Sequence, residues 1–333
     1  MKEVTPTALV LEEIRKTYPG GIEALRGVSL EVRPGEVFGL VGPNGAGKTT
    51  LLKIASGLLF PESGRVVCGA TDITRRPKQA AAWIGLMPDP LGVYTDISAR
   101  EYLEFFARLQ QVPAGRIEEA VNHAVDLLGL QPWLNDEVET LSAGWQRRLA
   151  LGRVLLSGTP VLLLDEPAAG LDVSARSELL GLVRTLAQSG RTLIVSSHIL
   201  PELQQLADRF AIINQGRWVT MASGSPFFTR DELQRGFAAA HWQMRCDRPG
   251  DAVRALAGRG LSATIDGDNL AFSAENEGVA AGGLKTVIDH GVTVYDFRRR
   301  QVELTELVLE VLQHENRQAG RPAPPDGRGG GRA

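Results

Sequence analysis

The amino-acid sequence predicts an α/β fold with a mainly parallel sheet, followed by a small α+β domain. Aliphatic runs alternate with helical patterns between residues 36 and 213, as they do in parallel sheets. The run 36–41 leads into a glycine-rich loop that opens a helix, and the run 161–164 ends in two adjacent acids. Beyond residue 240 the order of strands and helices changes, so we expect a second domain there.

Composition limits the class of protein. The 333 residues suffice for two domains, and 43% hydrophobic and 23% charged residues are ordinary for a soluble globular protein. A net charge of -3 gives no reason to expect nucleic acid as a partner. Cys68 and Cys246 lie far apart, which favours free thiols in a reducing compartment. No signal peptide is visible, and the apolar runs are far shorter than the ~20 residues that span a bilayer, so a membrane role requires a partner chain.

Strands and helices are expected in turn along the first part of the chain. Apolar and polar positions alternate within 8–35 between turn signals, which predicts antiparallel strands. The other expected elements are strands at 64–69, 161–164, 192–196 and 210–213, and helices within 98–130, 145–156 and 174–188.

A change of composition near 224–236 marks the expected domain boundary. We place the first domain at 1–225, with a helical subdomain at about 88–157, and the second at 226–313. The second has predicted strands at 242–246, 262–265, 270–273 and 292–297, and predicted helices at 252–257, 279–290 and 304–313. In chain order the first six elements run strand, helix, strand, strand, helix, strand, which resembles a split βαβ arrangement. Residues 314–333 are rich in Gly, Pro and Arg, and we expect disorder there.

The glycine-rich loop has the pattern of a phosphate-binding loop, G-x-x-x-x-G-K-[ST]. It comprises Gly42, Pro43, Asn44, Gly45, Ala46, Gly47, Lys48, Thr49 and Thr50. Its glycines allow the backbone N–H groups to surround phosphate oxygens, and the following helix directs its positive end to the same place. Lys48 would reach the β- and γ-phosphates of a nucleotide, and the Thr49 hydroxyl would ligate Mg²⁺. The strand before the loop and the helix after it disfavour the alternative, a plain glycine-rich turn.

Two strand ends are expected to bring acids and a histidine to one edge of the sheet. Asp165 would hold the water shell of Mg²⁺, and Glu166 would orient and deprotonate an attacking water. His198 follows the next strand and could donate a hydrogen bond to the γ-phosphate. Solvated acids and a structural histidine are the simpler interpretations of each segment alone, and the phosphate-binding loop favours the catalytic ones.

The segment 141–148, Leu-Ser-Ala-Gly-Trp-Gln-Arg-Arg, is expected to open a helix with Ser142 as its N-cap. Small residues at a helix N-terminus form a site for an anion. Helix capping would explain Ser142 but not the Gln-Arg-Arg that follows it.

Together these motifs resemble the nucleotide-binding subunit of an ATP-binding cassette (ABC) transporter, a P-loop NTPase, over about residues 8–222. The family signature Leu-Ser-Gly-Gly-Gln is matched by 141–145, the Walker-B strand and catalytic acid by 161–166, the D-loop by 169–172 and the switch histidine by His198. The resemblance implies an ATPase with ATP and Mg²⁺ as cofactors.

Tyr18 falls where this family stacks an aromatic ring on adenine, although a core tyrosine at a strand end is the alternative. Asp89 stands where the family usually has Gln, and it could ligate Mg²⁺ or its waters. The surrounding segment 87–94 nevertheless resembles a branch of bacterial ABC-2-type exporter ATPases. Ala143 and Trp145 also depart from the signature.

The resemblance implies a dimer in which ATP lies between two cassettes. Ser142 and Gly144, the expected phosphate contacts of the signature, would then face the ATP of the other subunit. The second cassette would be an identical chain or another ABC ATPase. A separate transmembrane permease subunit would be driven by dimer closure, and the chain would lie at the cytoplasmic face of a bacterial membrane, in contact with it only through the permease.

The permease would dock in the segment 83–110. Trp83, Tyr94, Tyr102 and Phe106 could contribute an apolar groove there, although core packing is the commoner fate of such aromatic side chains.

Two other functions stay open at this point. Soluble ABC ATPases that act on ribosomes or DNA usually resemble tandem cassettes or carry a long coiled-coil insertion, and the sequence shows neither. Asp89 and Trp145 suggest a binding module with little turnover, but Glu166 and His198 are intact. We therefore favour the ATP-hydrolysing subunit of an exporter, whose cargo this chain does not encode.

Overall fold

The computed structural model describes residues 8–299 except 95, 205, 221–224, 230–231, 233–239, 267–268 and 275. The chain forms two compact units, Met1–Arg230 and Asp231–Ala333. The division thus falls a few residues beyond the boundary that we expected at 225. The expected helix at 304–313 and the tail 314–333 lie outside the described residues.

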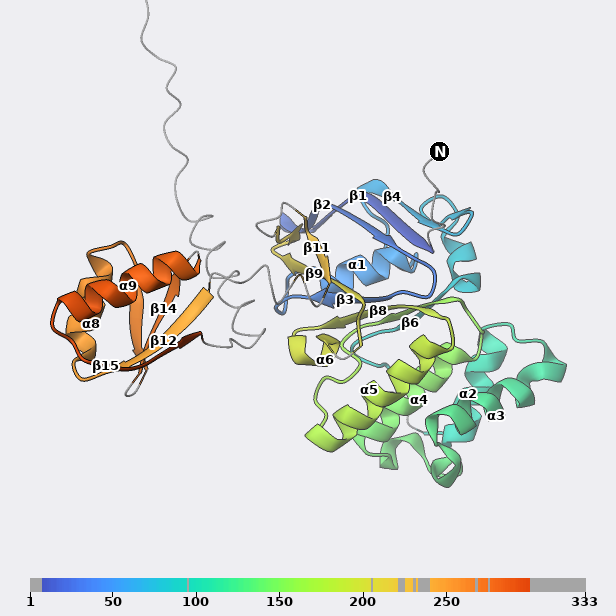
Figure 1. Ribbon diagram of the computed structural model, residues 1–333. Helices are drawn as coiled ribbons and strands as arrows, with labels where there is room; N and C mark the ends of the chain where they lie inside the picture. Colours follow the sequence, from blue (N-terminus) through green and yellow to red (C-terminus); the bar gives the residue numbers. More distant parts are fainter. Residues whose placement is uncertain are drawn as a thin grey trace, which may run out of the picture. The chain divides into compact units, whose positions relative to one another are not determined.

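A seven-stranded sheet forms the centre of the first unit, in the order β10-β9-β3-β8-β7-β6 with β11 paired to β9 (Figure 1). Its strands are β3 (Val37–Val41), β6 (Ile84–Met87), β7 (Val161–Leu164), β8 (Thr192–Ser197), β9 (Arg209–Asn214), β10 (Arg217–Trp218) and β11 (Phe227–Thr229). Adjacent strands are parallel from β9 through β3, β8 and β7 to β6, whereas β10 and β11 pair with β9 in the antiparallel direction. β3, β7 and β8 are buried along their whole length, which explains why apolar residues predominate in their sequences.

An antiparallel sheet covers the first unit on the other side of α1 (Lys48–Ala55) (Figure 1). Its strands are β1 (Leu9–Tyr18), β2 (Ile22–Val32), β4 (Ser63–Cys68) and β5 (Thr71–Asp72). Buried side chains of this sheet, such as Leu11, share one hydrophobic core with Leu51 of α1 and Phe38 of β3. The helix that follows the glycine-rich loop is therefore held between two sheets.

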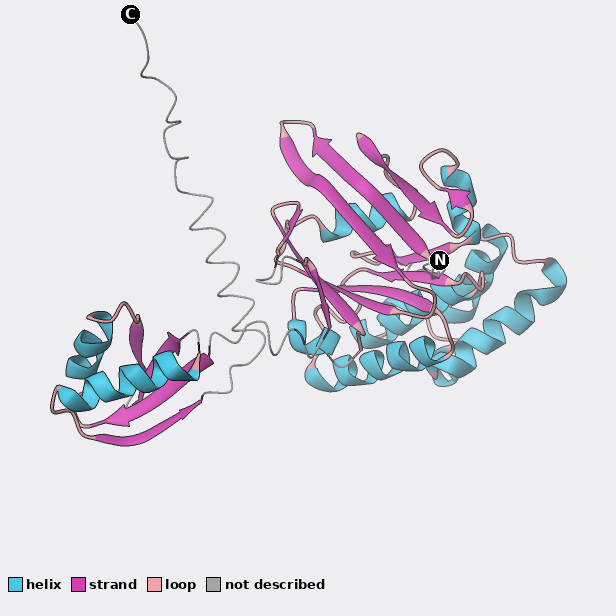
Figure 2. Ribbon diagram, turned by 45° about the horizontal axis from the view of Figure 1, so that its top comes forward, coloured by secondary structure: helices cyan, strands magenta, loops and turns pink. Residues whose placement is uncertain are grey.

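The α-helices of the first unit other than α1 lie on the opposite side of the parallel sheet (Figures 1 and 2). They are α2 (Ala99–Leu109), α3 (Ile117–Leu128), α4 (Ala143–Leu155) and α5 (Val173–Gln188), and the short α6 (Leu200–Gln204) follows β8. Ser98 begins α2 with a complete capping box, in which its hydroxyl accepts from the N–H of Glu101. The parallel strands all end at one edge of the sheet, where α/β proteins bind their ligands.

The second unit has the order β-α-β-β-α-β, as the sequence indicated. It comprises β12 (Ala240–Cys246), α8 (Pro249–Ala257), β13 (Ala263–Asp266), β14 (Asn269–Ala274), α9 (Glu277–Asp289) and β15 (Val294–Arg299). The antiparallel sheet has the order β13-β14-β12-β15, and α8 and α9 cover one of its faces (Figure 2). Its core of Met244, Leu270 and Val287 shares no residue with the core of the first unit. The structure thus confirms the expected fold class, a P-loop α/β core with a small α+β unit.

Candidate active site

The loop between β3 and α1 has a backbone path that only glycine permits at several positions. Gly45 and Gly47 have φ of 79° and 113°, in the left-handed region. A Cβ on Gly42 would lie 2.4 Å from the carbonyl oxygen of Ile213, and one on Gly47 would lie 2.6 Å from that of Ala24. Because Gly47 is also the N-cap of α1 and carries no side chain, the first N–H groups of the helix are left for an anion. The loop therefore fits a phosphate group.

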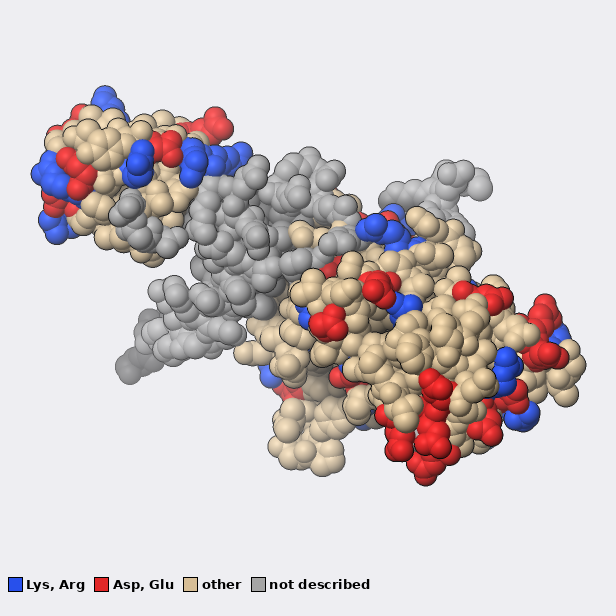
Figure 3. Space-filling model, turned by 90° about the horizontal axis from the view of Figure 1, so that it is seen from below, with Lys and Arg blue, Asp and Glu red and all other residues tan. Residues whose placement is uncertain are grey.

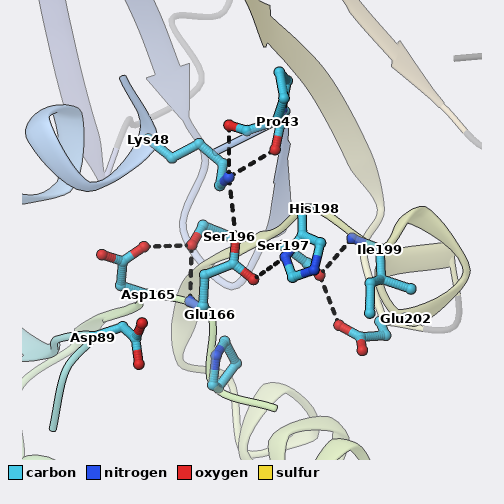
Figure 4. A network of polar contacts seen from close by, with 12 residues as sticks. Pro43, Lys48, Asp89, Asp165, Glu166, Ser196, Ser197, His198, Ile199 and Glu202 are labelled. Atoms are coloured by element: carbon cyan, nitrogen blue, oxygen red, sulfur yellow. Dashed lines mark hydrogen bonds and ion pairs between the residues drawn. The ribbon is translucent and has the colours of Figure 1, made fainter. Parts of the chain in front are cut away.

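Lys48 directs its ammonium group into the centre of this loop. Its Nζ donates to the carbonyl oxygens of Gly42 (2.7 Å) and Pro43 (3.2 Å), and it lies 3.0 Å from Oε1 of Glu166 (Figure 4). The side chain is only 5% exposed. A cation is thus fixed between the loop and the edge of the parallel sheet.

Glu166 lies directly beyond β7 in an uncommon backbone conformation. Its φ is 45°, which places a non-glycine residue in the left-handed region. Its N–H donates to Oγ of Ser196 (2.9 Å), and its Oε2 is 2.9 Å from Nδ1 of His198 (Figure 4). The carboxylate is consequently held between Lys48 and His198, where it can accept a proton from a bound water.

Asp165 is buried beside the first turn of α1. Its Oδ1 accepts a 2.6 Å hydrogen bond from the Ser196 hydroxyl, and the Thr49 hydroxyl also donates to its carboxylate. Burial raises the pKa of Asp165 and the charge of Glu166 adds to the rise, whereas the two hydroxyls and Lys48 act in the opposite direction. The oxygens of Thr49 and Asp165 are adjacent, and hydroxyl and carboxylate oxygens are the ligands that Mg²⁺ prefers. These residues therefore fit a magnesium ion.

Asp165→Asn is expected to raise the melting temperature of the nucleotide-free chain at neutral pH. The pKa of Asp165 is raised on folding, because burial disfavours the charged carboxylate. The protonated carboxyl therefore stabilises the folded chain fully below the unfolded pKa of about 3.9, and this stabilisation is lost as pH rises through the folded pKa. A neutral amide avoids this cost and can still accept from Ser196. We expect a rise of about 2–5 °C at pH 7.5 that shrinks toward pH 4, measured by differential scanning calorimetry. A melting temperature below wild type at pH 7.5 would contradict it.

Arg147 is part of this site although the sequence analysis did not identify it. From α4, its Nη1 donates to the carbonyl oxygens of Glu166 (2.9 Å) and Pro167 (3.2 Å), and its Nη2 donates to Oδ1 of Asp89 (3.2 Å). One signal was available in the sequence. Arg147 stands one helical turn before the apolar Leu151, which is buried, and a charged side chain so placed needs a partner.

Tyr18 lies at the far end of the loop, where its hydroxyl is 3.3 Å from Oγ1 of Thr50. The side chain is partly exposed, so its ring is not a core side chain. The structure leaves this ring accessible beside the phosphate-binding loop.

Ser142 is the N-cap of α4, as expected, but its side chain makes no capping hydrogen bond. Ser98, Asp172 and Asn276 do accept such bonds at the starts of their helices. A Cβ on Gly144 would lie 3.3 Å from Cβ of Ala175, so this helix start is next to α5. Among the described residues, no hydrogen bond joins Ser142 or Gly144 to the loop 42–50.

The structure therefore divides the expected site residues into two groups. One group meets at the carboxyl edge of the sheet and consists of Lys48, Thr49, Asp165, Glu166 and His198, with Asp89 joined to it through Arg147. The other group, Ser142 and Gly144, lies at the start of α4.

Known proteins are similar to this chain in sequence and in fold. Residues 25–169 match the family of ABC transporters. The daunorubicin resistance ATP-binding protein DrrA3 of Streptomyces coeruleorubidus is 31% identical over 315 residues, which cover 93% of this chain and 98% of that protein. The linearmycin resistance ATP-binding protein LnrL of Bacillus subtilis is 33% identical over 222 residues, 67% of this chain and 71% of that protein.

A Nod factor export ATP-binding protein I of Paraburkholderia xenovorans is 35% identical over 219 residues, 66% of this chain and 71% of that protein. Among solved structures, cbiO1 from Clostridium perfringens, part of the ABC transporter complex cbiONQ, has a TM-score of 0.60 and 28% identity, and the match covers 68% of this chain and 90% of that one. These relatives do not favour a soluble ABC ATPase or a low-turnover module. The chain therefore belongs to the ABC transporter family as one of its ATP-binding, ATP-hydrolysing subunits, and it is homologous to the ATP-binding proteins of exporters.

Proposed function

We propose that two copies of this cassette, or this cassette and another ABC ATPase, enclose two ATP molecules and drive a separate membrane subunit that exports a substrate. One observation supports the hydrolytic site most strongly. The Glu166 carboxylate is held between Lys48 Nζ (3.0 Å) and His198 Nδ1 (2.9 Å), next to a loop that fits phosphate.

In this proposal the residues of the carboxyl edge have distinct roles. The N–H groups of 42–50 and Lys48 bind the β- and γ-phosphates, and Thr49 and Asp165 hold Mg²⁺. When bound, Mg²⁺ neutralises charge on the β- and γ-phosphate oxygens. A phosphate would compete with Glu166 for the Lys48 ammonium, which would leave Oε1 free to orient a water and accept its proton. His198 would hold the carboxylate through Oε2.

The Ser142 hydroxyl supports the dimeric arrangement. It is exposed at a helix start and is not used to cap its own helix, so it can donate to an anion on another molecule. Together with the N–H of Gly144, it would complete the γ-phosphate site of the second subunit. Tyr18 would stack on the adenine of the nucleotide held by its own loop.

Ser142→Ala is expected to lower ATPase activity at least about tenfold, because it removes a phosphate contact, while it leaves the melting temperature nearly unchanged. Ser98→Ala is the matched control. It removes a capping hydrogen bond that is formed, so it should cost about 1 kcal/mol of stability and leave ATPase activity close to wild type. Phosphate release and thermal melting of both variants test this. If Ser142→Ala behaves like Ser98→Ala, its hydroxyl has only a capping role.

We further propose that the membrane subunit docks beside the start of α2. A cavity of about 440 Å³ lies there, lined by Val93, Tyr94, Asp96, Ile97 and Phe105. Tyr94 and Phe105 are exposed aromatic side chains in edge-to-face contact. Exposed apolar patches of this kind are typical of protein interfaces.

Two of the four aromatic residues expected in this groove pack inward instead. Tyr102 is fully buried, and Trp83 is partly buried against a hydrophobic core. Phe106 lies between, against the rings of Tyr94 and Tyr102. Tyr94 therefore remains in the proposed groove, and Phe105 joins it.

In the part of the chain that the structure describes, no helix has both the length and the apolar character to cross a bilayer. We propose a peripheral position at the cytoplasmic face of the membrane, with contact through the permease. On the face of the first unit seen in Figure 3, acidic side chains are at least as prominent as basic ones. That face gives no support to binding of nucleic acid.

A further inference from the structure

Arg147 connects three separate segments of the proposed hydrolytic site. It lies in the second turn of α4, the helix that begins at Ser142. Its guanidinium reaches the carbonyl oxygens that follow β7, at Glu166 and Pro167, and the carboxylate of Asp89 beyond β6. The Arg147 side chain is 11% exposed, so its guanidinium is largely shielded from water, whereas its partner Asp89 is 39% exposed. The planar fork of the guanidinium directs its two Nη groups to acceptors on different segments of the chain.

The conformation of Glu166 gives these contacts their importance. A left-handed glutamate is strained, and such residues persist only where their neighbours hold them. On one side the Glu166 N–H is bound by Ser196, and on the other its carbonyl oxygen is bound by Arg147. The direction of the carboxylate toward Lys48 and His198 depends on both hydrogen bonds.

Asp89 in turn orients Arg147. Parallel pairing aligns Met87 of β6 with Leu164 of β7, so Asp89 and Glu166 each lie two residues beyond the same rung of the sheet. Without the Asp89 carboxylate, the partners of this guanidinium among the described residues would be the neutral carbonyl groups of Glu166 and Pro167. The 3.2 Å contact with Arg147 thus accounts for an aspartate at this position without a metal.

We propose that Arg147 and Asp89 are positioning residues that hold the backbone of Glu166, and that Asp89 is not a ligand of Mg²⁺. Since Arg147 belongs to the helix that begins with Ser142 and Gly144, it also couples the placement of that helix to the direction of the Glu166 carboxylate. The inference rests on the proposed function of Glu166 as the base that accepts a proton from water.

The test compares Arg147→Lys, Asp89→Asn and the double variant in the full-length chain. We expect each single variant to lower kcat roughly 10- to 100-fold while KM for ATP changes less than about twofold, because the carboxylate is misplaced but the loop is not. The kcat of the double variant should lie within about twofold of the kcat of the slower single variant, since both substitutions act through one contact. ATP affinity by titration calorimetry and the Mg²⁺ concentration for half-maximal activity should match wild type.

Arg148→Lys is the matched control. Arg148 is the next residue of α4, but its guanidinium contacts Glu178 and the Trp145 ring instead of Glu166. Its kcat should stay within about twofold of wild type. If Arg147→Lys does not fold, as judged by its melting curve, Asp89→Asn decides alone, since Asp89 is 39% exposed.

Three results would overturn the proposal. One is a wild-type kcat in Arg147→Lys or in Asp89→Asn. Another is a double variant whose loss is the product of the two single losses, which shows independent roles. The third is an Mg²⁺ requirement that rises about tenfold or more in Asp89→Asn with kcat restored at high Mg²⁺, which shows a metal ligand. Failure of the proposed function looks different, because then Glu166→Gln itself would retain turnover.

Discussion

Glu166→Gln is expected to lower ATP turnover by about 10²–10⁴-fold, the usual contribution of a general base. The amide has the size of the carboxylate and can still hydrogen-bond to His198, but it cannot take a proton from water. It also removes a negative charge 3.0 Å from Lys48, so ATP should bind at least as tightly as to wild type. We therefore expect an ATP-bound dimer that persists on gel filtration, together with a phosphate-release assay close to background.

Glu178→Gln is the control for this variant. Glu178 is an exposed acid of α5 that pairs with Arg148, and its replacement should leave turnover near wild type. If Glu166→Gln hydrolyses ATP at the wild-type rate, another group deprotonates the water. If it remains monomeric with ATP, the dimeric arrangement is wrong for this chain.

Gly47→Ala is expected to weaken ATP binding by about 100-fold. The new Cβ would lie 2.6 Å from the carbonyl oxygen of Ala24 and 3.0 Å from the Leu25 side chain, and the backbone would be strained at φ 113°. The loop or β2 must shift, at a cost of about 2–4 kcal/mol of stability. A cost of about 3 kcal/mol to restore the loop around phosphate corresponds to roughly 100-fold in Kd. Chemical denaturation and calorimetric titration with ATP measure the two effects.

Gly45→Ala separates backbone strain from the steric clash. Gly45 also has a positive φ, 79°, but a Cβ there meets no atom within 4 Å. We expect a loss of only about 1 kcal/mol in stability. Equal losses in the two variants would show that the clash with Ala24 is relieved without cost.

The parts of the site that were predicted from sequence are those that local chemistry dictates. A phosphate-binding loop needs glycines and a lysine at fixed spacing, so the pattern at 42–50 is readable without a structure. Asp165, Glu166 and His198 follow buried strands, and parallel pairing brings such strand ends to one edge. The structure places Asp165 and Glu166 beside Lys48 and His198 beside Glu166.

The contacts that were not predicted join residues far apart in the chain. Arg147 and Asp89 are 58 positions apart, and no local pattern relates them. The left-handed backbone of Glu166 is likewise invisible in the sequence, since glutamate does not favour it. The division after Arg230 falls within the change of composition at 224–236, and the long-range pairing of Phe227–Thr229 with β9 explains why it lies beyond residue 225. The roles of Ser142 and Gly144 stay predictions, since they depend on a second molecule.

The conformation of Glu166 sets two evolutionary pressures against each other. Asparagine or glycine would adopt this left-handed backbone more readily, so selection for folding alone would replace the glutamate. Asp165, next to it, is a buried acid that the fold would also tolerate better as an amide. Where descendants of this chain are released from the need to hydrolyse ATP, this dipeptide is the first place at which we expect drift toward neutral residues.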